Sequence, residues 1–93
     1  MFESRRVQVE LGQIVGTSSA LKTLDPESIR VALGRHVRGD WGDLDAHDRA
    51  ANEAALRNGD RLLSVYSDSK GTRFYVITEW DRSVTTVLLP EDY

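Results

Sequence analysis

The fold is decided by the stretch RLLSVYSDSKGTRFYVITEWDRSVTTVLLPEDY, residues 61–93. Three runs rich in Val, Ile, Thr, Tyr and Phe are separated by the short polar groups DSKG and WDRS. This pattern predicts strands over residues 61–67, 72–79 and 84–90, joined by tight turns. Strands joined by turns this short pair antiparallel, so the chain is expected to end in a three-stranded antiparallel meander.

Both faces of the predicted meander are apolar. One face would carry Leu63, Val65, Tyr75, Ile77, Val87 and Leu89, and the other Leu62, Tyr66, Phe74, Val76, Val84 and Leu88. A single layer of helices covers one face only. Either helices cover both faces, or a second copy of the chain seals one of them. We favour the second alternative, a homodimer through the sheet, because large apolar patches are rarely left bare.

The residues before the meander predict a further strand and two to three helices. Val7, Val9 and Leu11 alternate with polar residues, which indicates a half-buried strand within residues 6–15. The hydroxyl side chains of residues 17–19 can cap a short helix over residues 20–24.

A second helix is expected to start at Asp25-Pro26 and to run to about Arg38. A glycine-rich loop over residues 39–44 follows it. Asp45 then starts an alanine-rich helix, which Asn58-Gly59 ends with Gly59 as a left-handed cap. The chain therefore predicts a single α+β domain over residues 1–93. It would contain an N-terminal strand, two to three helices and the meander, in a sheet of about four strands.

The chain has 93 residues, no cysteine and a formal net charge of −3. The lack of cysteine excludes disulfides and thiolate metal sites. The acidic balance disfavours a nucleic-acid partner, because binding to phosphates needs clustered Lys and Arg. No apolar run approaches the roughly 20 residues of a membrane span, and residues 1–10 lack a signal-peptide core. We therefore expect a cytoplasmic protein without a membrane segment.

The two histidines are the first candidates for chemistry. His36, between Arg35 and Val37, would be a general acid or base in a functional interpretation. A partly buried histidine at the end of a helix is the favoured alternative. His47 lies among aspartates in the first turn of the third predicted helix and could join a carboxylate-rich metal site. Ordinary helix capping explains those aspartates better, so we expect no metal and no cofactor.

Two loops carry tryptophan beside aspartate. Trp41 lies between Asp40 and Asp43, and Trp80 is followed by Asp81 and Arg82. An exposed Trp in such a loop can anchor a partner protein. The alternative for Trp41, that its ring folds inward over the core, is slightly favoured because so small a core needs its aromatic rings.

The run Arg57-Asn58-Gly59-Asp60-Arg61-Leu62-Leu63 resembles the arginine-bearing entry to a central strand in barnase-type microbial ribonucleases. The resemblance implies that Arg57 and Arg61 hold the scissile phosphate. That family also uses a glutamate base on an earlier strand and a histidine acid in the loop between its last two strands. Here that loop is WDRS, without histidine, and loss of an acid or base costs about 10²–10⁴-fold each. A helix cap followed by a strand is the favoured interpretation.

Three longer motifs span nearly the whole chain. They are GQIV at 12–15, RHVRGDWGDL at 35–44 and ITEWDRSVTTVLLPEDY at 77–93. Together they resemble a family of small, uncharacterised bacterial proteins described as plasmid-related or hypothetical. No activity is established for that family, so the resemblance implies only an association with bacterial mobile DNA.

We therefore expect a non-enzymatic binding or accessory protein that acts through protein contacts. Its candidate contact residues are Asp40, Trp41, Asp43, Trp80, Asp81 and Arg82. The alternative is a small ribonuclease or toxin-like enzyme, in which His36 transfers protons and the phosphate is held by Arg57, Arg61 and Arg82. A third interpretation is a regulator that contacts DNA. It requires a basic face made of Arg30, Arg35, Arg38 and Arg5 or Arg6.

Overall fold

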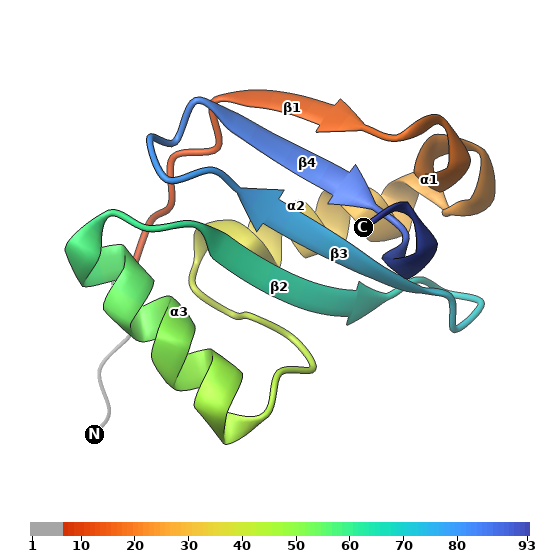
Figure 1. Cartoon of the computed structure of the whole chain (residues 1–93). Helices are drawn as coiled ribbons and strands as arrows, with labels where there is room; N and C mark the ends of the chain where they lie inside the picture. The colour runs from red at the N-terminus through yellow and green to blue at the C-terminus, as the bar shows by residue number, and fades with distance from the viewer. Residues whose placement is uncertain (1–6) are drawn as a thin grey trace.

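A four-stranded mixed sheet with strand order β1-β4-β3-β2 organises the chain (Figure 1). The computed structural model describes residues 7–93. The antiparallel meander is formed by β2 (Leu62–Ser67), β3 (Arg73–Thr78) and β4 (Val84–Leu88). The strand β1 (Gln13–Gly16) is added to β4 in parallel. The predicted α+β class and the three-stranded meander are confirmed.

The N-terminal strand is displaced from its predicted position. The alternation of Val7, Val9 and Leu11 does not mark a strand, and the ladder starts only at Gln13; residue 6 lies outside the described residues. The Val9 side chain is buried, and its backbone N–H donates to the Val37 carbonyl at 2.9 Å. The alternation of apolar residues therefore reflects side chains of an irregular segment that pack on the core. It does not indicate backbone pairing in the sheet.

Within residues 7–93, three helices and one 3₁₀ turn complete the fold. They are α1 (Ser18–Thr23), α2 (Pro26–Val37), α3 (Ala46–Asn58) and η1 (Pro90–Asp92). The predicted caps are confirmed: the side chains of Thr17, Asp25 and Asp45 accept from backbone N–H groups three residues on. Gly59 ends α3 with φ +73°, in the left-handed region that glycine adopts without steric cost.

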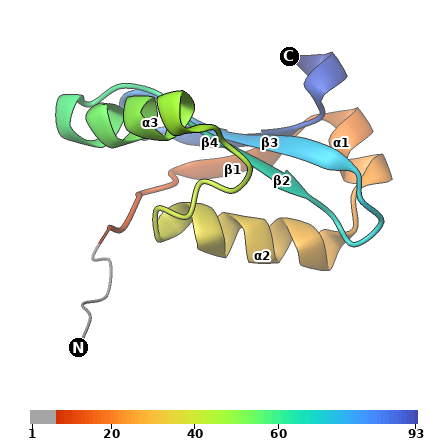
Figure 2. The ribbon, with the colours of Figure 1, turned by 90° about the horizontal axis from the view of Figure 1, so that it is seen from below.

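Helices cover one face of the sheet. Figure 2 shows α2 lying along this face. The core between the two layers contains Ala20, Leu24, Ala32, Tyr66, Phe74, Val76, Val87 and Leu89. The predicted sharing of faces is wrong for β4: Val87 lies opposite Val76, and Leu88 lies opposite Tyr75. The length and shape of the β3–β4 turn set this register, and one residue of offset exchanges the two faces.

The edge of the sheet at β2 is closed by the chain itself. Figure 1 shows α3 beside this strand. The Asn52 amide on α3 donates to the Leu63 carbonyl at 2.6 Å, and its oxygen accepts from the Leu63 N–H at 3.1 Å. Val65 donates to the Trp41 carbonyl and accepts from the Asp43 N–H. This close approach requires Gly42, where a Cβ would lie 1.9 Å from the Val65 oxygen.

The opposite face of the sheet has no helix over it, yet its apolar floor is not bare. Ile77 and Leu88 are 5% and 7% exposed. The Tyr93 ring, next to η1, packs edge-on against Tyr75 with centroids 5.8 Å apart. The expectation of a homodimer rested on a bare apolar face. Because the apolar residues of this face are already buried within one copy, the face does not require a second copy to cover it, and an association of two copies stays a prediction.

Asn52→Ala tests the closure of the β2 edge. The variant removes the one amide that satisfies both backbone groups of Leu63, and we expect the free energy of unfolding to fall by about 1–3 kcal/mol. Urea denaturation followed by circular dichroism measures it. The matched control is Asn58→Ala, on an exposed residue of the same helix, which should change stability by less than about 0.5 kcal/mol. Equal losses in the two variants would contradict the role of Asn52.

Candidate functional site

His36 lies inside the protein, with no exposed surface. Its Nδ1 lies 2.6 Å from the Ser64 hydroxyl and its Nε2 lies 2.9 Å from the Thr78 hydroxyl. Thr78 is 2.7 Å from Thr85, which donates to the Leu11 carbonyl at 2.7 Å. The imidazole therefore joins α2 to β2 and β3 directly, and to β4 through Thr78.

The direction of these hydrogen bonds can be assigned because each hydroxyl group has only one proton to donate. Thr85 donates to a carbonyl, so it accepts from Thr78, and Thr78 accepts from the His36 Nε2–H. Nδ1 then accepts from Ser64. Burial, together with the nearby Arg82 cation, lowers the pKa of His36 to about 4. The structure favours the structural interpretation of His36, because both nitrogens of its neutral ring have partners inside the fold, and the role of a catalytic acid or base stays an untested alternative.

The buried imidazole makes stability depend on pH. The folded pKa is about 4 and the unfolded value is 6.5. The unfolded chain therefore binds the proton first as pH falls below 6.5, and the contribution of His36, about 3 kcal/mol, is lost between pH 6.5 and pH 4. We expect the free energy of unfolding of wild type to fall more steeply over this range than that of His36→Gln, measured by urea denaturation at each pH. Parallel pH profiles for the two proteins would show that the ring titrates equally when folded and unfolded.

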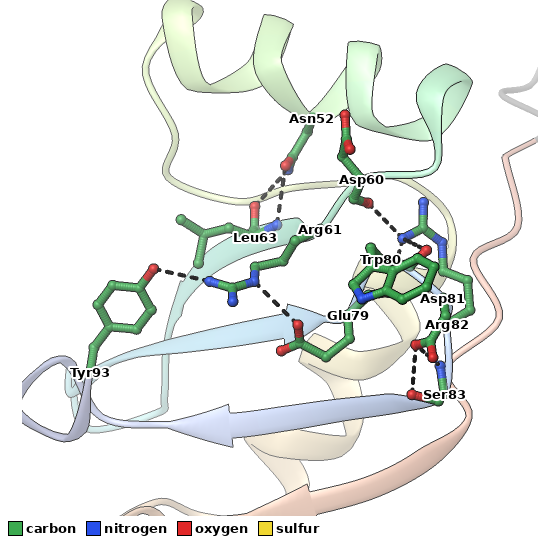
Figure 3. A network of polar contacts seen from close by, with 10 residues as sticks. All are labelled: Asn52, Asp60, Arg61, Leu63, Glu79, Trp80, Asp81, Arg82, Ser83 and Tyr93. Atoms are coloured by element: carbon green, nitrogen blue, oxygen red, sulfur yellow. Dashed lines mark hydrogen bonds and ion pairs between the residues drawn. The ribbon is translucent and has the colours of Figure 1, made fainter.

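Arg82 fastens the β3–β4 loop to the end of α3 (Figure 3). Its guanidinium donates to the carbonyls of Asp60, Glu79 and Trp80 and, at 3.4 Å, to that of Ala55. The backbone of Arg82 has φ +61°, a left-handed conformation that is uncommon for a residue with a side chain. These carbonyls engage Nη1 and part of Nη2, which favours a structural role for Arg82, and its role as a phosphate clamp stays an untested prediction.

The proposed ribonuclease residues do not meet at one open site. Arg57 is exposed on the last turn of α3. Arg61 lies on the helix-free face of the sheet, whereas His36 is enclosed on the face that α2 covers. A constellation of one imidazole and three guanidinium groups around a phosphate is therefore absent from the described part of the chain.

A structural role for Arg82 predicts a loss of stability when the side chain is removed. We expect Arg82→Ala to lower the free energy of unfolding by about 2 kcal/mol, because carbonyls of two elements lose their charged donor and the left-handed turn loses its support. Arg57→Ala, on the exposed end of α3, should stay within about 0.5 kcal/mol of wild type. Thermal and urea denaturation measure both, and a neutral Arg82→Ala would restore Arg82 as a free cation.

The helix-free face contains a hollow of about 220 Å³. Ile77, Thr86 and Leu88 line it together with the side chains of Arg61 and Glu79. Figure 3 shows the Arg61 guanidinium between Glu79 and Tyr93; its Nε donates to the Glu79 carboxylate at 3.3 Å and its Nη1 to the Tyr93 hydroxyl at 3.5 Å. These long, largely exposed contacts contribute little to stability and can rearrange around a ligand. Glu79 and Tyr93 were not identified from the sequence as site residues.

Trp80 follows Glu79, which lines this hollow, and like Tyr93, which is 70% exposed, it is a largely exposed aromatic side chain. Its side chain is 66% exposed at the tip of the β3–β4 loop. On the other side of the tip, the Asp81 carboxylate accepts from the Ser83 N–H and hydroxyl, which lowers the pKa of Asp81. Asp81 and Arg82 thus hold the loop, and Trp80 projects from it (Figure 3).

The first predicted loop does not present its tryptophan. Trp41 is 2% exposed, and its indole N–H donates to Glu53 at 2.9 Å. Of the two alternatives, the inward one is confirmed and the exposed anchor is wrong. Asp40 pairs with Arg35 at 2.7 Å, which lowers the pKa of Asp40, while the backbone of Asp43 extends the sheet edge.

A second hollow, of about 320 Å³, lies between α2 and the β2–β3 turn. Although it is larger, its carboxylates are used by the fold. Asp25 caps α2, and Asp68 accepts from the N–H groups of Asp25, Lys70 and Thr72. The Arg35 guanidinium on its wall lies 4.9 Å from the Tyr66 ring centroid. The polar groups therefore serve the turn, and we regard the helix-free face as the candidate site.

The structure gives no support to the basic face required for DNA contact or to a metal site. Arg30 is paired with Glu27 and Arg35 with Asp40, so the cations available for DNA are reduced; Arg5 and Arg6 lie outside the described residues. Within residues 7–93, no group of three His, Asp or Glu side chains is arranged to hold a metal ion. Over the same range, each helix is too short or too polar to cross a membrane.

Comparison with protein-family models, curated proteins and solved structures finds no match for this chain. Neither the resemblance to the plasmid-related family nor that to barnase-type ribonucleases is tested by these comparisons. Any functional argument therefore rests on the geometry of the molecule.

Proposed function

We propose that this is a non-enzymatic binding protein that contacts a partner protein through Trp80 and the adjoining hollow on the helix-free face. The observation that carries the proposal is the 66% exposure of Trp80 on a loop held by several hydrogen bonds. Tryptophan is among the residues most often dominant in protein interfaces. An exposed indole costs solubility, so a loop braced to present one is best explained by a partner.

Preorganisation strengthens this argument. A flexible loop must be ordered on binding, which lowers affinity. Here Arg82 joins the loop to carbonyls of the α3–β2 connection and of the loop itself, and Asp81 bonds Ser83. The position of Trp80 is therefore set before a partner arrives.

The hollow supplies the second half of the surface. Ile77 and Leu88, which are 5% and 7% exposed, line its floor and present a small apolar surface to a side chain of the partner. At its rim, the guanidinium of Arg61 and the carboxylate of Glu79 can respectively donate to and accept from main-chain groups. An apolar floor with a polar rim is the usual anatomy of a protein interface.

Binding is supported over catalysis by the positions of the reactive groups. The imidazole of His36 is enclosed and the guanidinium of Arg82 donates to several carbonyls, so both side chains have structural partners in place of a substrate. An association with bacterial mobile DNA rests on the sequence resemblance alone and stays a prediction.

Photo-crosslinking identifies the partner. A benzophenone amino acid at position 80 should capture a specific protein in bacterial cells that express the variant. The same probe at Val31, which is 47% exposed on α2, is the control for chance contact. Capture of the same proteins at both positions would contradict a site at Trp80.

Trp80→Ala then measures the contribution of the indole to binding of the purified partner. We expect the dissociation constant to rise by at least about 30-fold, which corresponds to the 2 kcal/mol of an interface hot spot, in isothermal titration calorimetry. Val31→Ala should bind as wild type does, and circular dichroism confirms that both variants are folded. Unchanged affinity of Trp80→Ala would rule out the proposal.

A further inference from the structure

The two edges of the sheet differ in whether their outward backbone groups have hydrogen-bond partners. At β2, the outward backbone groups of Leu63 and Val65 are satisfied by Asn52 and by residues 41–43. At the other edge, no segment of residues 7–93 lies beside β1 on the side away from β4 in Figure 1. An unprotected edge strand is a template for pairing with another strand.

The ladder shows which groups of β1 face outward. The N–H groups of Gln13 and Thr17 donate to the carbonyls of Ser83 and Val87 on the β4 side. Because backbone direction alternates along a strand, the N–H and C=O groups of Ile14 and Gly16 point away from β4. Among the described residues, none forms a hydrogen bond with them.

The side chains at this edge are apolar and exposed. Ile14 is 51% exposed and Leu21, on α1, is 59% exposed. Leu21 lies against Gly16, where an added Cβ would come within 2.8 Å of the Leu21 side chain. Residues 11–21 contain no charged residue in a chain whose charged fraction is 29%. Lysine and proline, which commonly protect edges, are absent from β1.

We propose that β1 pairs antiparallel with β1 of a second copy of this chain, across a two-fold axis at Val15. In this register Ile14 of one copy lies opposite Gly16 of the other, and their outward N–H and C=O groups form four hydrogen bonds. The two sheets become one continuous sheet with an isologous contact.

The register fits the side chains of the edge. Ile14 and Gly16 are on the same face, since they pair with Thr85 and Val87. The exposed Ile14 of one copy therefore meets a position without a side chain, beside Leu21 of the other copy. A bulky residue at position 16 would obstruct both Leu21 and the incoming Ile14.

Charge also favours a second copy as the occupant. The first charged residues on either side of the neutral segment are Glu10 and Lys22. Antiparallel pairing brings the end of β1 near Glu10 towards the end of the other β1 near Lys22. These two charges have opposite signs in the antiparallel arrangement and like signs in a parallel one, while Asp92, which accepts from Thr17 and Ser19 at 2.6 Å, adds a negative charge at the Lys22 end. The contact is small, and we expect a dimer whose population depends on protein concentration.

Val15→Cys tests the axis, because the chain has no other cysteine. Residues opposite each other at such a position have Cα atoms about 4.5 Å apart, within the range that a disulfide spans. Under mild oxidation we expect a covalent dimer that forms at least about tenfold faster than for Val31→Cys, since pairing raises the effective thiol concentration. The control is stringent because Val31 is 47% exposed and Val15 is 37% exposed, so exposure alone would favour cross-linking at position 31.

Ile14→Pro separates strand pairing from chance collision. Proline removes an N–H that points away from β4, so the monomer keeps its own ladder; circular dichroism checks the fold. Added to Val15→Cys, it should reduce cross-linking to the Val31→Cys rate, and alone it should leave a monomer in sedimentation equilibrium at concentrations where wild type dimerises. A wild type that stays monomeric at millimolar concentration, equal cross-linking at positions 15 and 31, or cross-linking that persists with Ile14→Pro would each overturn the proposal.

Discussion

The structure depends on one buried imidazole. Through Ser64 and Thr78 the His36 ring joins α2 to β2 and β3, and the chain of hydroxyls continues through Thr85 to the Leu11 carbonyl. One side chain therefore connects the helical layer, three strands and the segment that leads into β1. Networks of this kind specify a unique core when every member is satisfied, and no buried side-chain nitrogen or oxygen in the described residues lacks a partner.

This use of histidine also limits the chemistry that the protein can perform. A neutral ring with both nitrogens engaged cannot exchange protons with a bound substrate. Arg82 also has a structural role, because its guanidinium donates to carbonyls of α3, of the α3–β2 connection and of the β3–β4 loop. The two residues that most suggested catalysis are thus the two that hold the fold together, and the exposed groups that remain suit recognition.

The molecule is asymmetric in what it exposes. One face of the sheet is covered by helices, and the β2 edge is sealed by α3 and residues 41–43. The other face presents the hollow beside Trp80, and the β1 edge presents exposed Ile14. One surface lies on a face of the sheet and the other along an edge, and the β3–β4 loop adjoins the start of β1, since the Gln13 N–H donates to the Ser83 carbonyl.

Local patterns were sufficient for much of the fold. Alternating β-branched and aromatic residues located the meander, and capping residues such as Asp25 and Asp45 located the helices, because these signals act between residues close in sequence. The start of β1 was predicted too early, because the alternation of Val7, Val9 and Leu11 reflects packing of side chains on the core and not backbone pairing in the sheet.

The candidate site could be predicted only in part. Trp80 was identified from its loop, but Arg61, Glu79 and Tyr93, which line the adjoining hollow, are far apart in sequence and meet only when β2, β3 and the C-terminus assemble. Composition and capping alone determined an α+β chain with a terminal meander. Tertiary packing decided that His36 and Trp41 point inward, that Arg82 binds carbonyls and which sheet edge stays open, because burial and hydrogen-bond partners depend on contacts between distant segments.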